Sequence, residues 1–91
     1  MLALRWEAEA FRKFQDALAY VANRNNPAAE RLAREVSRIF EMARRFSALG
    51  RPGRVAESHE LVTHPNYLLV YAVRTNSIDV IRFLHARQFY P

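Results

Sequence analysis

The sequence predicts an α+β domain in which an N-terminal strand and two helices precede a three-stranded antiparallel sheet. Two segments in the first half carry apolar residues at helical spacing, and Asn23-Arg-Asn-Asn-Pro27 separates them. Three short segments in the second half are rich in β-branched and aromatic residues and are joined by turn residues. The length of 91 residues is that of one domain, which we expect to span residues 1–91.

The N-terminal part is predicted to form a strand followed by a helix. Residues 1–6 alternate in the manner of a strand with one buried face, with Leu2, Leu4 and Trp6 on that face. A helix is then predicted from Glu7 to about Ala22. It has no capping residue near Trp6, and its apolar stripe consists of Phe11, Phe14, Leu18 and Val21.

A second helix is predicted to begin with Asn26 as its N-cap and Pro27 at its first position. An asparagine before it is expected to end the first helix in the left-handed conformation. Because the connection is short, the helices should form an antiparallel hairpin. The apolar stripe of this helix is Ala29, Leu32, Val36, Ile39, Phe40, Ala43 and Phe46. Its arginines lie mostly off the stripe, as on a solvated face.

Residues 47–56 are predicted to be a basic loop, and three strands follow it. These are Ser58–Thr63, Tyr67–Arg74 and Ile78–Ala86. The middle strand should be covered on both faces. The last strand alternates between two partly apolar sets: Ile78, Val80, Arg82 and Leu84, and Asp79, Ile81, Phe83 and His85. Two helices cover one face of the sheet, so we expect an uncovered apolar face that binds a partner.

Composition limits the classes of function. The net charge of +5 favours an acidic partner. The chain has no cysteine, and its three histidines lack zinc-site spacing, so we expect neither metal nor cofactor. No signal peptide is evident, and the longest apolar run is too short to span a bilayer. The sequence therefore predicts a cytoplasmic protein without a membrane partner.

One catalytic chemistry is compatible with the C-terminal residues. Metal-independent RNA cleavage needs a base, an acid and a cation for the phosphate. His85, Arg87 and Tyr90 offer these groups. The alternative interpretation is that His85 merely ends a strand and that Arg87 is solvated.

Several motifs resemble the ParE branch of the RelE/ParE toxin superfamily over almost the whole chain. The most specific are the Pro-x-Tyr-x-x-x-Tyr block ending at Tyr71 and the terminal His85-Ala-Arg87. Trp6-x-x-x-Ala10, Asn26-Pro-Ala-Ala29 and Gly50-Arg-Pro-Gly53 agree with it. The resemblance implies a β-α-α-β-β-β fold and the toxin of a bacterial type II toxin–antitoxin pair, often called a plasmid stabilisation protein.

The resemblance also implies partners. A cognate antitoxin, ParD-like or similar, would neutralise the toxin with a flexible segment, and operator DNA would be contacted only through that antitoxin. Three positions depart from family patterns. His59 and Ala72 stand where arginines are frequent, and Leu68 stands where ribosome-dependent RelE-type nucleases have a catalytic arginine.

Three hypotheses for function follow. In the first, which we favour, the protein causes growth arrest by inhibiting DNA gyrase without catalysis, and Arg74, Arg82, His85 and Arg87 contact the target. In the second it is a ribosome-dependent mRNA endoribonuclease that uses His85, Arg87 and Tyr90. In the third it is an inactive remnant that only binds its antitoxin.

Overall fold

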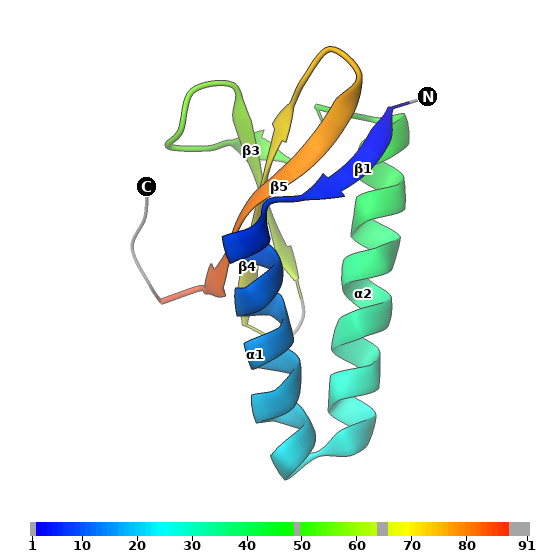
Figure 1. The fold of residues 1–91 in the computed structure, drawn as a ribbon, viewed down its shortest axis with the longest axis vertical. Helices are drawn as coiled ribbons and strands as arrows, with labels where there is room; N and C mark the ends of the chain where they lie inside the picture. Colours follow the sequence, from blue (N-terminus) through cyan, green and yellow to red (C-terminus); the bar gives the residue numbers. More distant parts are fainter. Residues whose placement is uncertain (1, 49, 64–65, 88–91) are drawn as a thin grey trace.

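The computed structural model describes residues 2–48, 50–63 and 66–87. Its elements are β1 (Ala3–Trp6), α1 (Ala8–Arg24), α2 (Asn26–Arg45), β2 (Arg51–Pro52), β3 (Ser58–Thr63), β4 (Tyr67–Val73) and β5 (Ser77–His85). The helices run antiparallel and lie together on one face of a five-stranded sheet (Figure 1). The predicted order of strands and helices is confirmed, with one short strand added.

The sheet has the order β1-β5-β4-β3-β2 and is mixed. Strands β3, β4 and β5 form the predicted antiparallel meander, whereas β1 pairs with β5 in parallel. Strand β2 lies within the segment that was predicted to be a loop, and it pairs with His59 and Glu60 of β3. Its proline is tolerated because an edge strand does not need every backbone donor. Two residues are too few to show strand alternation, so no pattern in the sequence indicated β2.

The connection between the helices differs from the prediction at one residue. Asn25, not Asn26, is the N-cap of α2, because its side-chain oxygen accepts a hydrogen bond from the Ala28 N–H at 3.1 Å. Pro27 is therefore the second residue of α2. Asn25 also ends α1, with an extended φ of −159° instead of the predicted left-handed conformation. The first helix begins one residue later and ends two residues later than predicted.

The main core lies between the helices and the sheet. Its buried members are Ala10, Leu32, Val36, Phe40, Ala43, Leu69, Tyr71, Ile78, Val80 and Phe83. Trp6 of β1 stacks on Phe14 of α1 at 4.9 Å between ring centroids. Two predicted stripe members are instead exposed, Phe11 by 41% and Phe46 by 66%. Phe46 is exposed because α2 ends at Arg45 and Phe46 leaves the helical conformation.

The second face of the sheet holds a smaller core, which corrects the prediction of an uncovered apolar face. Leu68, Val70, Ala72 and Ile81 are buried there. Val55, from the segment before β3, and Leu84 pack against this cluster. The middle strand β4 is thus buried on both faces, as predicted.

A β-bulge in β5 changes which side chains share a face. Val70 of β4 lies opposite Arg82. The next residue, Tyr71, lies opposite Val80, so Ile81 is an additional residue in β5. A bulge shifts the alternation by one position. The two sets of side chains predicted for the two faces of the last strand are therefore wrong beyond the bulge. The buried side chains on the helix side are Ile78, Val80 and Phe83.

No helix of the described segments is long and apolar enough to cross a membrane.

Candidate functional site

The end of β5 places His85 among aromatic and basic groups. The Tyr67 ring stacks on Phe83 at 5.4 Å, and the His85 ring lies edge-on to Tyr67 at 5.6 Å. The Arg87 backbone N–H donates to His85 Nδ1 at 3.2 Å. In the neutral imidazole, Nε2 then carries the proton. The backbone of Arg87 thus contacts the His85 ring, and the use of these two residues in target binding stays a prediction.

A groove of about 280 Å³ opens between α1 and the ends of β4 and β5. It is lined by Lys13, Asp16, Ala17, Tyr20, Tyr67, Phe83, Leu84 and His85. Tyr20 is 56% exposed, and the Arg24 guanidinium carbon lies 4.0 Å from its ring centroid. At an exposed site such a cation–π contact contributes about 0.5–1 kcal/mol. Sequence reasoning considered only the apolar stripe of the first helix. It missed these α1 residues because residues such as Tyr20 lie off that stripe.

Arg82 lies on the face of the sheet that points away from the helices. The bulge places it opposite Val70 of the second-face cluster. Its Nη1 donates to the Ile81 carbonyl oxygen at 2.7 Å, and the residue remains exposed. The bulge therefore fixes the direction of Arg82, three residues before His85.

Arg74 lies at the opposite end of β5 from His85. Its Nε donates to Asp79 Oδ2 at 3.3 Å, and its Nη2 is 3.8 Å from Glu7 Oε2. Strand β5 has nine residues, so at about 3.3 Å per residue its ends are roughly 26 Å apart. Of the four predicted target-binding residues, Arg74 is therefore far from His85 and Arg87, and Arg82 lies on the other face of the sheet from His85.

Asp79 is the centre of the network that contains Arg74. It is buried, and Ser77 Oγ donates to its Oδ1 at 2.7 Å. Arg5 of β1 approaches the same carboxylate at 3.8 Å. Burial acts to raise the pKa of Asp79, but the hydrogen bonds and the two arginine charges lower it below its ordinary value. The network joins β1 to β5, which is a structural role.

The side chains of His59 and Tyr71 contact the segment between α2 and β2 and hold it against the sheet. The Tyr71 hydroxyl donates to the Ser47 carbonyl and accepts from the Gly50 N–H, each at 3.0 Å. Burial raises the pKa of Tyr71. The His59 ring stacks on Tyr71 at 5.3 Å, and its Nδ1 lies 3.1 Å from the Gly50 carbonyl oxygen. The histidine that departs from the family pattern thus has structural contacts.

Two other positions bear on catalysis. Leu68 is only 6% exposed and belongs to the second-face cluster, as does Ala72. Tyr90, the third residue of the nuclease hypothesis, lies outside the described residues. Within the described segments, no three His, Cys, Asp or Glu side chains are grouped so that they could hold a metal ion.

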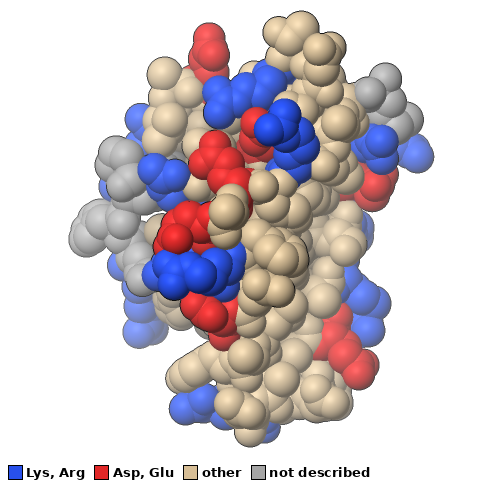
Figure 2. Space-filling view, viewed as in Figure 1, with Lys and Arg blue, Asp and Glu red and all other residues tan. Residues whose placement is uncertain are grey.

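The positive charge is dispersed on the helix side of the molecule. Figure 2 shows Lys and Arg side chains interspersed with Asp and Glu there, without one continuous basic surface. Many of the arginines lie within 4.0 Å of an acidic side chain, namely Arg5, Arg12, Arg34, Arg38, Arg44, Arg51 and Arg74. Most of the excess charge therefore does not form a single anion-binding site.

Comparisons with known proteins agree with this arrangement. The family model described as "ParE toxin of type II toxin-antitoxin system, parDE" matches residues 4–90. A Sinorhizobium fredii protein described as "Putative toxin Y4kP" is 27% identical over 89 residues, covering 97% of this chain and 92% of that protein. A solved structure described as "Chromosomal ParDE TA system from P. aeruginosa" has a TM-score of 0.76 and 17% identity, covering 96% of this chain and 98% of that chain. This last comparison shows likeness of fold.

Proposed function

The chain belongs to the ParE toxin family of type II toxin–antitoxin systems, and we propose that it arrests growth by inhibiting DNA gyrase until a cognate antitoxin neutralises it. In this proposal the protein acts by binding, without catalysis, in the cytoplasm. The observation that carries the choice of target is the position of Leu68.

Leu68 stands where the ribosome-dependent nucleases of the superfamily have a catalytic arginine. The side chain is buried in an apolar cluster with Val70 and Ile81. A leucine there offers no charge to a phosphate, and a cation at that position would lose hydration without gaining a partner in the cluster. Phosphoryl-transfer chemistry relies on cations aimed at the developing charge. The position therefore favours a binding toxin over a nuclease.

The adjacent His85 and Arg87 support the endoribonuclease as a second candidate. A histidine could exchange a proton with a ribose hydroxyl, and an arginine could hold phosphate. The same two residues can equally provide a binding surface, for which no proton transfer is needed. We therefore retain them as target-contact residues and treat the nuclease, like the inactive remnant, as an outcome of the tests below.

The proposed target surface consists of His85 and Arg87. Both lie at or directly after the end of β5. Arg82 is left out because it lies on the face of the sheet that points away from the helices, opposite the face of His85. The groove beside α1 continues this surface past Tyr67 to Tyr20. Aromatic and arginine side chains are the types that contribute most to protein interfaces. Arg74 is left out of the surface because it lies at the other end of β5 and bonds to Asp79.

The direct test is a supercoiling assay with purified gyrase and increasing toxin. The His85→Ala/Arg87→Ala variant should need at least tenfold more toxin for half-inhibition, which corresponds to about 1.4 kcal/mol of binding free energy. A matched control is Arg12→Ala/Gln15→Ala, which changes two exposed side chains of α1 outside the groove. Gyrase that is unaffected at saturating wild-type toxin would reject the proposed target.

A test in cells separates the three hypotheses. Induction of the toxin alone should arrest growth with a DNA damage response while translated messages stay intact. Cut messages that disappear in the His85→Ala variant would favour the nuclease. Normal growth would indicate the inactive remnant, and rescue of growth by co-expressed antitoxin tests the proposed neutralisation.

A further inference from the structure

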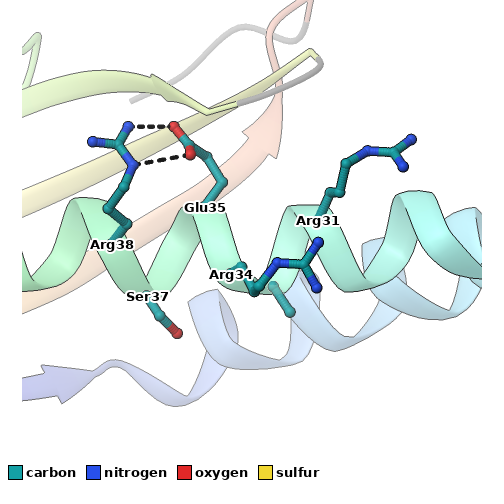
Figure 3. A pocket seen from close by; sticks show the side chains of 6 residues that line it. Arg31, Arg34, Glu35, Ser37 and Arg38 are labelled. Atoms are coloured by element: carbon teal, nitrogen blue, oxygen red, sulfur yellow. Dashed lines mark hydrogen bonds and ion pairs between the residues drawn. The ribbon is translucent and has the colours of Figure 1, made fainter.

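Four arginines form a stripe along the exposed face of α2: Arg31, Arg34, Arg38 and Arg45. With 3.6 residues per turn, these positions fall within about 60° of the helix circumference, opposite the buried residues of α2. Arg31 and Arg45 are 14 residues apart in the sequence, which is about 21 Å along the helix axis. Figure 3 shows Arg31 and Arg38 extending from one side of α2, with Arg34 in front of them.

The stripe is only partly neutralised by acidic neighbours. Glu35 accepts two hydrogen bonds from Arg38, at 2.6 and 3.1 Å (Figure 3). Glu30 lies 4.0 Å from Arg34, a distance at which an exposed pair contributes little. No ion pair joins Arg31 or Arg45 to an acidic side chain in the part of the chain that the structure describes. The stripe therefore retains cationic groups that an external carboxylate can reach.

An apolar hollow lies at the C-terminal end of the stripe. Its volume is about 240 Å³, and it is lined by Arg38, Glu41, Met42, Arg45 and Phe46. Phe46 is 66% exposed, more than any other large apolar side chain among the described residues. The hollow is smaller than the roughly 300–1,000 Å³ of small-molecule sites, so its size suits a single side chain. Arg38 and Arg45 border both the hollow and the stripe.

We propose that the stripe and the hollow together bind an acidic segment of the antitoxin that carries one apolar anchor residue. The inference rests on the proposed function, which provides the antitoxin as a partner. Carboxylates of the segment pair with Arg31 and Arg45, and also with Arg38 once it exchanges its bond with Glu35. The anchor residue packs against Phe46 and Met42.

The apolar hollow is the reason for choosing a protein segment over DNA. A phosphate backbone would use the arginines alone and leave the exposed Phe46 without a role. The position of the stripe is the reason for choosing the antitoxin over the target. The proposed target surface ends at His85 beside α1, whereas the stripe occupies the outer face of α2. A target bound at the first surface therefore does not need the second.

The test is the affinity of the full-length toxin for its antitoxin, measured by calorimetry at 0.1 and 0.5 M NaCl. The stripe variant is Arg31→Gln/Arg38→Gln/Arg45→Gln, which keeps helix propensity but removes three charges. The matched control is Arg12→Gln/Lys13→Gln/Arg24→Gln on α1, which removes the same charge. We expect the stripe variant to bind at least tenfold more weakly at 0.1 M NaCl and the control to change less than threefold. The difference should shrink at 0.5 M because salt screens exposed charges.

The hollow is tested with Phe46→Ala, and Val62→Ala serves as the control at another exposed apolar residue. A tenfold loss for Phe46→Ala alone supports the anchor. Equal losses in the stripe and control variants, or unchanged affinity in both, overturn the inference. The inference is also overturned if the stripe variant binds the antitoxin with unchanged affinity but no longer inhibits gyrase or no longer binds duplex DNA. Failure of wild-type toxin to inhibit gyrase, with antitoxin binding intact, would reject the proposed target and leave this inference standing.

Discussion

Removal of one hydroxyl group should show how strongly the segment between α2 and β2 is held to the sheet. Tyr71 is fully buried, and its hydroxyl bonds to both Ser47 and Gly50. Tyr71→Phe removes both hydrogen bonds, each worth about 0.5–1.5 kcal/mol, and leaves the buried Gly50 N–H without its partner. We expect the free energy of unfolding to fall by about 2–3 kcal/mol. That is a large part of the 5–15 kcal/mol typical of a native domain.

Urea unfolding followed by circular dichroism measures this loss. The midpoint should fall while the m-value stays constant, because the surface exposed on unfolding is unchanged. Tyr20→Phe is the matched control, since Tyr20 is 56% exposed, and it should change the stability by less than about 0.5 kcal/mol. A loss below about 0.5 kcal/mol for Tyr71→Phe would refute the argument that the hydroxyl fastens this segment.

The pKa of the same hydroxyl predicts how the loss depends on pH. Burial raises the pKa of Tyr71 above its ordinary 10.0, and the Gly50 N–H opposes this by lowering it. The stabilisation is therefore fully present below pH 10 and is lost as the pH rises toward the folded-state pKa, because the unfolded chain releases the proton first. The stability difference between wild type and Tyr71→Phe should then be smaller at pH 11 than at pH 7. An equal difference at both pH values would contradict the raised pKa.

Three further variants test other parts of the fold. Gly50→Ala would place a Cβ 2.6 Å from the Glu60 carbonyl oxygen. We therefore expect a lower Tm and a loss of about 1–3 kcal/mol in the free energy of unfolding. An unchanged Tm would show that the backbone relaxes freely. Asp79→Asn should destabilise at pH 7. Because the pKa of Asp79 is lowered, its contribution is present above pH 3.8 and disappears as the pH falls through the folded value. The stabilities of wild type and variant in urea titrations should therefore converge as the pH falls below 3.8. Leu68→Ala should cost about 2–5 kcal/mol in urea unfolding because Leu68 is buried; a loss under about 1 kcal/mol would mean that the second-face cluster is loosely packed.

The order of elements followed from local patterns in the sequence. Helical spacing in two segments and turn residues between three apolar segments are properties of neighbouring residues, so they identified both helices and the meander. The proximity of His85 and Arg87 also followed from the sequence, because only one residue separates them. The family resemblance, which rested on motifs spread over the whole chain, was confirmed.

Features that depend on contacts between distant residues required the tertiary structure. Strand β2 forms only because β3 offers it an edge, and Asn25 caps α2 through the backbone geometry of the hairpin. One additional residue at Ile81 decided which side chains of β5 face the helices, and periodicity cannot reveal a bulge that interrupts it. The sequence thus determined which residues were available for binding, and long-range pairing and packing decided which of them share a surface.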